Sequence, residues 1–289
     1  MQEETTSIET LVERAKEGNQ QALEAVLRSI QDRVYNLALR MLQVPADAED
    51  AAQEILVKVV THLSEFRGES AFPTWVYRIA TNYLLTTRKR RAEQREMTLQ
   101  ALGVQLEYSL ALGEAEVPDG HEERLLIEEV QFNCILGMLV CLDRVHRITL
   151  ILGEIFEVTS EEGAYIMETT PVNFRKRLSR ARNQIRGFVQ QKCGIVNPAN
   201  PCRCSKHVGN KIHYGLLNPN KLEYAVAVQM PSFEEIKHKH AQEMCELGDT
   251  AALFQTLPAY AAPETAVEGI KELLYSGRFS MFDPFQGEE

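Results

Sequence analysis

The sequence predicts an all-α protein: two small helical domains joined by a linker, followed by a small mixed or mainly helical C-terminal extension. Three observations predict this class. Apolar residues recur at three-and-four spacing over most of the first 190 residues. Capping residues and prolines stand where these periodic segments begin and end. A length of 289 residues with 44% hydrophobic content suits two or three small domains better than one.

Composition and charge exclude several classes of protein. No stretch of eighteen uncharged apolar residues is present, and the N-terminal MQEETTSIET is polar and acidic, unlike a signal sequence. We therefore expect a cytoplasmic protein without membrane insertion. In a reducing compartment its six cysteines are expected to be thiols or metal ligands, and not a disulfide framework.

Positive charge is concentrated in two islands of an otherwise acidic chain, whose formal net charge is -10. Residues 66–95 hold seven Arg or Lys against two Glu, and residues 171–186 hold six against no acid. Residues 104–162 hold thirteen acids against three bases. Such a distribution is typical of a protein that touches a polyanion at two separate places, although a single basic run is often only a solvated helix face.

A helix is expected over residues 20–43, and a second helix is expected directly after it in the chain. The first helix ends before Pro45. The segment "PADAED" indicates the start of the second helix, with Asp47 as the candidate N-cap and Asp50 in the first turn. A polar, mostly acidic edge of the second helix is left for solvent or for a protein partner. Its inward stripe is Ala52, Ile55, Leu56, Val59, Val60 and Leu63.

A further helix is expected from Pro73 onward, in the stretch "FRGESAFPTWVYRIATNYLLTTRKRR". The pattern places Phe72, Trp75, Val76, Ile79, Ala80 and Tyr83 inward, and Tyr77, Arg78, Thr81, Asn82 and Thr86 outward. On this interpretation Trp75 belongs to the core. Tyr77, with Phe66 and Arg67 of the preceding loop, is free to stack on or contact an unpaired base. The run from Arg88 to Arg91 then neutralises phosphates.

Residues 96–122 have weak periodicity, three glycines and many acids, so we expect an acidic linker with at most a short helix. The helical spacing of apolar residues resumes at residue 123, which predicts a further helix. In that helix Cys134 and Cys141 are expected to act as small buried hydrophobes.

Residues 143–186 predict a helix-turn-helix. A helix over 143–156 is followed by Thr159 or Ser160 as an N-cap, a short helix over 161–168, a tight turn and Pro171 at the start of a last helix. In that last helix one face is apolar and the other basic, so its N-terminal part can enter a major groove. The alternative is an ordinary helical hairpin. The inward residues are Phe174, Leu178, Ala181 and Ile185, and the outward ones Arg175, Lys176, Ser179 and Arg182.

Two blocks of this pattern resemble a known family. "ADAEDAAQEILVKVVTHLSEFRGESAFPTWVYRIATNYLLTTRKRR" resembles region 2 of the extracytoplasmic-function (ECF) sigma factors, and "LDRVHRITLILGEIFEVTSEEGAYIMETTPVNFRKRLSRARNQIR" is similar to region 4. The turn "METTPVNFRKR" departs from the usual region 4 pattern, which puts a common-type -35 preference in doubt. The resemblance implies region 2 over 8–95, an acidic linker over 96–122 and region 4 over 123–190.

The resemblance also implies function. Such a protein binds bacterial core RNA polymerase and promoter DNA, promotes melting, has no catalytic residue and needs no cofactor. Core polymerase is bound by Asp47, Asp50, Gln53 and Glu54. The -10 element is contacted by Phe66, Arg67, Glu69, Ser70, Tyr77, Arg78, Asn82, Arg88 and Lys89. The -35 element is contacted by Pro171, Asn173, Arg175, Lys176, Ser179 and Arg180.

Residues 191–289 lie beyond a minimal ECF sigma factor. Cys193, Cys202, Cys204 and His207 stand at C-x8-C-x-C-x2-H spacing, which suits zinc, a thiophilic metal or redox-active thiols, and equally suits structural thiols without a ligand. Two short helices are expected over 232–247 and 263–277. We hypothesise that this extension regulates the sigma core in cis and replaces or supplements an anti-sigma factor.

Two other classes of protein remain as alternatives. A helix-turn-helix transcription regulator with a metal- or redox-sensing C-terminal domain would bind duplex DNA without polymerase, and gives no reason for the region 2 block. A metallo-enzyme or thiol-redox domain fused to a DNA-binding module would need a nucleophile paired with a base, and the extension shows no such pair in sequence.

Overall fold

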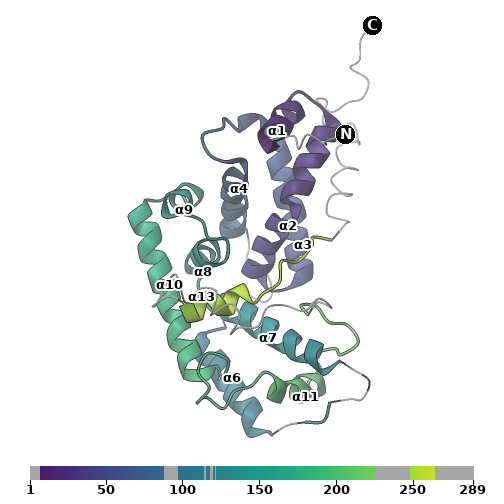
Figure 1. The fold of residues 1–289 in the computed structure, drawn as a ribbon, viewed down its shortest axis with the longest axis vertical. Helices are drawn as coiled ribbons and strands as arrows, with labels where there is room; N and C mark the ends of the chain where they lie inside the picture. The colour runs from purple at the N-terminus through teal and green to yellow at the C-terminus, as the bar shows by residue number, and fades with distance from the viewer. Residues whose placement is uncertain are drawn as a thin grey trace. The chain divides into compact units, whose positions relative to one another are not determined.

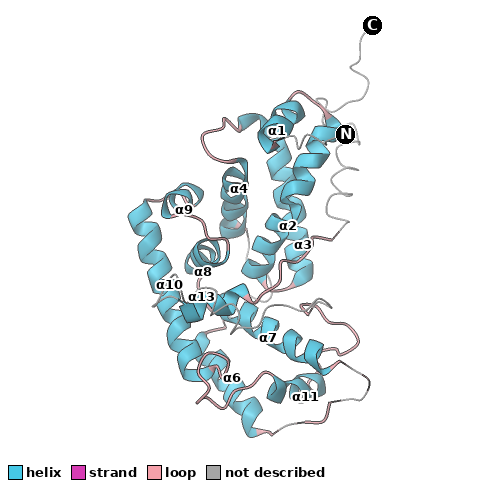
Figure 2. Ribbon diagram, in the orientation of Figure 1, coloured by secondary structure: helices cyan, strands magenta, loops and turns pink. Residues whose placement is uncertain are grey.

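The computed structural model describes residues 7–87, 97–113, 115–117, 120, 122–225 and 248–263. Their regular elements are all helices (Figure 2). One isolated parallel β-bridge joins Cys193 to Cys202. The chain divides into two compact units. The first contains residues 1–88, 164–169 and 259–289, and the second contains residues 89–163 and 170–258. The predicted all-α class is confirmed.

The first unit is built around one long helix, α2 (Gln20–Leu42), which packs against α1 (Ile8–Lys16), α3 (Pro45–Thr61) and α4 (Phe72–Thr86) (Figure 1). The side chain of Asn19 caps α2 by accepting from the amide of Ala22 at 2.9 Å. The helix therefore agrees with the predicted 20–43 to within one residue.

The start of α3 differs from the prediction. Pro45 is its first residue, Val44 is the N-cap without a side-chain hydrogen bond, and Asp47 lies in the first turn. Proline at the first helical position needs no amide partner, so the carboxylate is not required as a cap. All six predicted inward residues are buried, five of them in α3 and Leu63 in the 3-10 turn over Leu63–Glu65 that follows it.

The buried face of α4 also differs from the prediction. Tyr77 and Thr81, expected to point outward, are 7% and 0% exposed, whereas Trp75, Ile79 and Tyr83 are only half-buried. The reason is that α4 packs against both α2 and α3, so its buried surface is wider than one stripe and is turned toward Tyr77.

The second unit contains α6, α7, α8, α10, α11 and α13, and α9 is divided between the two units. The predicted linker holds the regular 13-residue helix α6. The predicted helix over 143–156 is interrupted, because α8 passes into a π-helical turn over Ile151–Ile155. The bounds are α6 (Leu99–Ala111), α7 (Glu123–Val140), α8 (Arg144–Leu150), α9 (Ser160–Ile166), α10 (Pro171–Lys192), α11 (Ser205–His213) and α13 (Gly248–Gln255).

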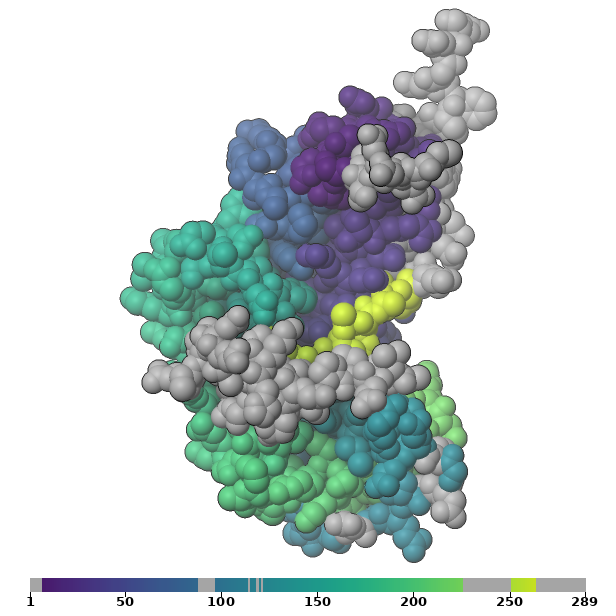
Figure 3. All heavy atoms as spheres, viewed as in Figure 1, coloured from purple at the N-terminus to yellow at the C-terminus, as the bar shows by residue number. Residues whose placement is uncertain are grey.

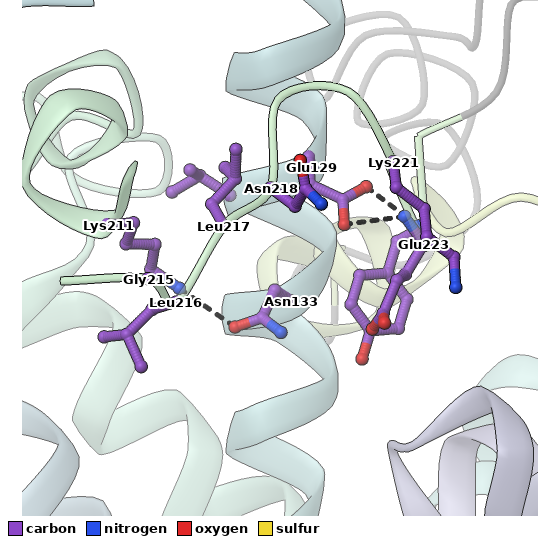
Figure 4. Close-up of a pocket in the computed structure, with 11 residues that line it drawn as sticks. Glu129, Asn133, Lys211, Gly215, Leu216, Leu217, Asn218, Lys221 and Glu223 are labelled. Atoms are coloured by element: carbon purple, nitrogen blue, oxygen red, sulfur yellow. Dashed lines mark hydrogen bonds between the residues drawn. The ribbon is translucent and has the colours of Figure 1, made fainter. Parts of the chain in front are cut away.

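The first part of the extension shares a core with α7. Val208 of α11 and Leu217 form one apolar cluster with Leu126 and Val130 of α7. A cavity of about 210 Å³ lies beside this cluster, and Figure 4 shows the residues that line it. At its edge the buried carboxylate of Glu129 accepts hydrogen bonds from three successive backbone amides, those of residues 223–225, at 2.7 to 2.9 Å.

The second part of the extension is described only in places. The helix predicted over 232–247 lies outside the described residues, and so does that over 263–277 apart from Pro263. Among the described helices none has the length and apolar character needed to cross a membrane.

Candidate nucleic-acid interface

A helix-turn-helix is formed by α9, the following turn and α10. Thr159 and Glu162 make a reciprocal capping box, in which each side chain accepts from the other's backbone amide, and Thr170 caps α10 ahead of Pro171. A Cβ added to Gly163 would lie 2.4 Å from the ring of Phe174, so this glycine permits the close approach of the two helices. The predicted helix starts are confirmed here.

The second helix has the two faces that its sequence predicts. Phe174, Ala181 and Ile185 are at most 1% exposed and Leu178 is half-buried. Of the predicted -35 residues Pro171 is half-buried, and the exposed ones are Asn173, Arg175, Lys176, Ser179 and Arg180. A basic, solvent-facing first half of α10 has the charge and shape that a major groove accepts.

Arg182 is an exception to the predicted outward face. Its guanidinium donates to the carboxylate of Glu154, and the side chains are 21% and 6% exposed. A carboxylate this deeply buried needs a cationic partner to offset its desolvation. Arg182 therefore holds α10 to the π-helical turn.

The aromatic residue of the loop before α4 is also placed differently from the prediction. Phe66 is 6% exposed, and its ring lies 5.3 Å from that of Phe72 and 5.4 Å from that of Trp75. Lys16 of α1 donates to the backbone carbonyl of Phe66 at 2.6 Å. The expectation that Phe66 and Tyr77 are free to stack on a base is wrong for this structure, because both are core residues.

Of the other predicted -10 residues, the five that the structure describes remain at the surface. Arg67, Glu69 and Asn82 are exposed, and Ser70 and Arg78 are half-buried, whereas Arg88 and Lys89 lie outside the described residues.

Within the first unit, Glu168 engages two of these residues. It accepts from Arg78 at 2.8 Å and from Asn82 at 3.5 Å, and the Arg78 guanidinium lies 4.9 Å from the ring centre of Tyr165. No local pattern predicts this partner, because Glu168 is 90 residues from Arg78 in the chain.

The predicted polymerase-binding residues share the polar edge of α3. Asp50 and Glu54 are exposed, and Asp47 and Gln53 are half-buried. All four lie off the buried stripe, so the helix presents carboxylates to solvent along one edge, as the sequence predicts.

The thiol cluster of the extension is only partly assembled. The sulfur of Cys202 lies 3.4 Å from Nε2 of His207, and the backbone of Cys202 pairs with that of Cys193. In the part of the chain that the structure describes, no three His, Cys, Asp or Glu residues are arranged to hold a metal ion. The metal site at these residues and Cys204 stays a prediction.

The helix-turn-helix with its basic outer face is typical of a DNA-binding transcription protein. Comparison with known proteins agrees with that class. Residues 26–94 match the family model for sigma-70 region 2. The chain is 33% identical over 195 residues to the ECF RNA polymerase sigma-E factor of Escherichia coli, covering 66% of this chain and 97% of that protein. It is 32% identical over 178 residues to the RNA polymerase sigma-H factor of Pseudomonas aeruginosa, covering 61% of this chain and 90% of that protein.

The chain therefore belongs to the ECF sigma factors, and it is an alternative sigma factor of transcription initiation. The predicted resemblance to the ECF sigma factors is confirmed. About a third of the chain lies outside the match to sigma-E.

Proposed function

We propose that this chain binds core RNA polymerase through the polar edge of α3 and reads promoter DNA at two places. The exposed basic first half of α10 carries the proposal, because its five exposed predicted residues share the outward face of a helix-turn-helix. At the -10 element we retain Arg67, Glu69, Ser70, Arg78 and Asn82, which lie at the surface.

The chain needs no catalytic group for this function, because phosphodiester chemistry belongs to the polymerase. Its contribution is binding energy. Capture of unstacked bases offsets the few kcal/mol that opening a duplex step costs, and basic residues add salt-dependent phosphate contacts.

Run-off transcription with core polymerase on a promoter library tests the proposal. We expect the full chain to co-purify with core and to select promoters that share one -35 sequence with each other, whether or not it is the usual one of the family. Arg175→Ala should weaken that selection by about 1 to 3 kcal/mol. Gln184→Ala changes an exposed residue farther along α10 and serves as the matched control.

The polymerase contact has a separate test. Asp50→Ala with Glu54→Ala should lower affinity for core and leave the unfolding free energy unchanged, because both side chains are exposed. Glu65→Ala, another exposed acid of the same unit, is the control. Failure of the wild-type chain to bind core would overturn the main proposal.

We further propose that the extension regulates the sigma core in cis. Its last described residues, 259–263, form the end of the yellow segment in Figure 3 and belong to the first unit, where they contact α2. The amide side chain of Asn36 donates to the carbonyl of Tyr260 at 2.6 Å and accepts from its backbone amide at 3.0 Å. Asp32 accepts from the backbone amide of Ala262 at 2.8 Å. These three hydrogen bonds join the backbone of the extension to side chains of α2, and they support regulation through region 2.

A proline substitution tests this docking without altering region 2. Ala262→Pro removes the amide that Asp32 accepts from, whereas Ala261→Pro places the same ring at an exposed neighbour. We expect only the first to change promoter-dependent run-off transcription by the full chain. Equal transcription by wild type and both variants would contradict regulation through this contact.

A further inference from the structure

Helix α6 lies in the stretch between region 2 and region 4 that the sequence predicts to be a linker, and little of it is buried. Within the second unit it packs against α10 and α11. Of its 13 residues, all of which the structure describes, only Gly103 is buried, and Val104 and Tyr108 are 60% and 63% exposed. An isolated helix of this length is marginal in water, so contacts with its neighbours decide whether α6 forms.

Helix α11 of the extension holds the C-terminal end of α6. The side-chain amide of Asn210, which is 6% exposed, donates to the carbonyls of Ser109 at 3.0 Å and of Gly113 at 2.8 Å. Nδ1 of His207 also lies 2.8 Å from Oγ of Ser109. The carbonyls of a last helical turn have no amide of the same helix to accept from, so Asn210 supplies a missing donor from another helix.

The contact between α11 and the linker leaves no spare room. A Cβ added to Gly209 would lie 1.9 Å from the carbonyl oxygen of Ala115, so the backbone of the linker would have to move. The contact of α6 with α10 is less close, since a Cβ added to Gly103 would meet only side chains, at 3.5 Å. The ion pair between Lys192 of α10 and Glu107 is largely exposed and contributes little. The attachment of α6 is therefore strongest at α11.

We propose that α11 acts as a latch on the linker: while Asn210 caps α6 the linker is short, and when α11 releases α6 the linker lengthens. Thirteen residues span about 20 Å as a helix and about 43 Å when extended. Release therefore adds up to about 23 Å to the reach between region 2 and region 4. This consequence rests on the proposed function, and it gives regulation in cis a second point of control, separate from the contact on α2.

Hydrogen exchange of the full chain, read by mass spectrometry, tests the latch independently of transcription. Gly209→Ala is the most direct variant, because alanine favours helix α11 itself while its methyl group displaces the linker. We expect the amides of α6 to exchange at least about tenfold faster in Gly209→Ala and in Asn210→Ala, with those of α7 unchanged. Gly187→Ala makes the same change in α10, where nothing lies within 4 Å of the added Cβ, and should exchange as the wild type does.

Two exchange results would overturn the proposal. One is unchanged exchange of α6 in both Gly209→Ala and Asn210→Ala. The other is an equal increase in α6 and α7, because α6 would then open only together with the core that α7 shares with α11.

Run-off transcription on promoters with increasing distance between the -10 and -35 elements tests the consequence. Each base pair adds about 3.4 Å, so Gly209→Ala should stay active at spacings up to about six base pairs longer than the wild type accepts. Gly187→Ala should follow the wild type. An unchanged range of spacings in Gly209→Ala, with α6 released, would overturn the role of linker length. Failure of the wild type to bind core would instead reject the proposed function and leave the exchange result standing, so the two failures are distinguishable.

Discussion

The two helices assigned to promoter contacts, α4 and α10, differ in how they are held. Helix α10 buries one stripe and presents a basic face, whereas α4 packs against two helices and buries Tyr77 and Thr81 as well as its apolar residues. Helix α10 has several neighbours, among them α6, α8 and α13, but its buried residues stay on one stripe, so its amphipathic division stays clean. The buried surface of α4 is wider than one stripe, so the spacing of its apolar residues alone misassigns its exposed face.

The largest effect is expected at the buried stripe of α10. Phe174→Ala should lower the unfolding free energy by about 4 kcal/mol, because it removes a 1%-exposed ring packed against Gly163. Val172→Ala, at a 50%-exposed neighbour, is the control and should change it little. Denaturant unfolding of the full chain measures both. Similar losses for the two would mean that α10 lacks the one-sided packing inferred here.

A slightly smaller loss tests the corrected face of α4. Tyr77→Ala should cost about 3 kcal/mol of stability, because the side chain is 7% exposed and lies beside Arg33 and Arg40 of α2. Asn82→Ala, exposed on the same helix, should leave stability nearly unchanged. If Tyr77→Ala reduced promoter melting at unchanged stability, Tyr77 would be a base-stacking residue and α4 would resemble α10 after all.

The third prediction compares two arginines within α10. Arg182→Gln should cost about 2 kcal/mol, because it leaves the Glu154 carboxylate buried without its cationic partner. Arg175→Gln, at an exposed side chain 4.0 Å from Glu161, should leave thermal stability unchanged and weaken DNA binding. The reverse pattern would place Arg182 on the DNA-contacting face.

What the sequence predicts well are features that depend on near neighbours in the chain. The Thr159 capping box, Pro171 and the stripe of α10 need only spacing. The predicted N-cap of α3, Asp47, is wrong because Pro45 is also a residue that favours a helix start, and the helix begins there. The π-helical turn has no recognisable pattern in the local sequence. Contacts such as Ser109 with His207 or Asn36 with Tyr260 join residues 98 and 224 positions apart, so no pattern in one sequence predicts them.

The smallest effect is expected at Glu168, which lies in the turn before α10 and contacts Arg78 of α4. The two side chains are 56% and 38% exposed, so solvent screens the pair, and Glu168→Gln should cost less than about 1 kcal/mol of stability. That loss should shrink further in high salt. Glu161→Gln, at a 75%-exposed carboxylate 4.0 Å from Arg175, is the control. A salt-independent loss above about 2 kcal/mol would show that Arg78 is held as firmly as Arg182, and would remove Arg78 from the residues free to meet DNA.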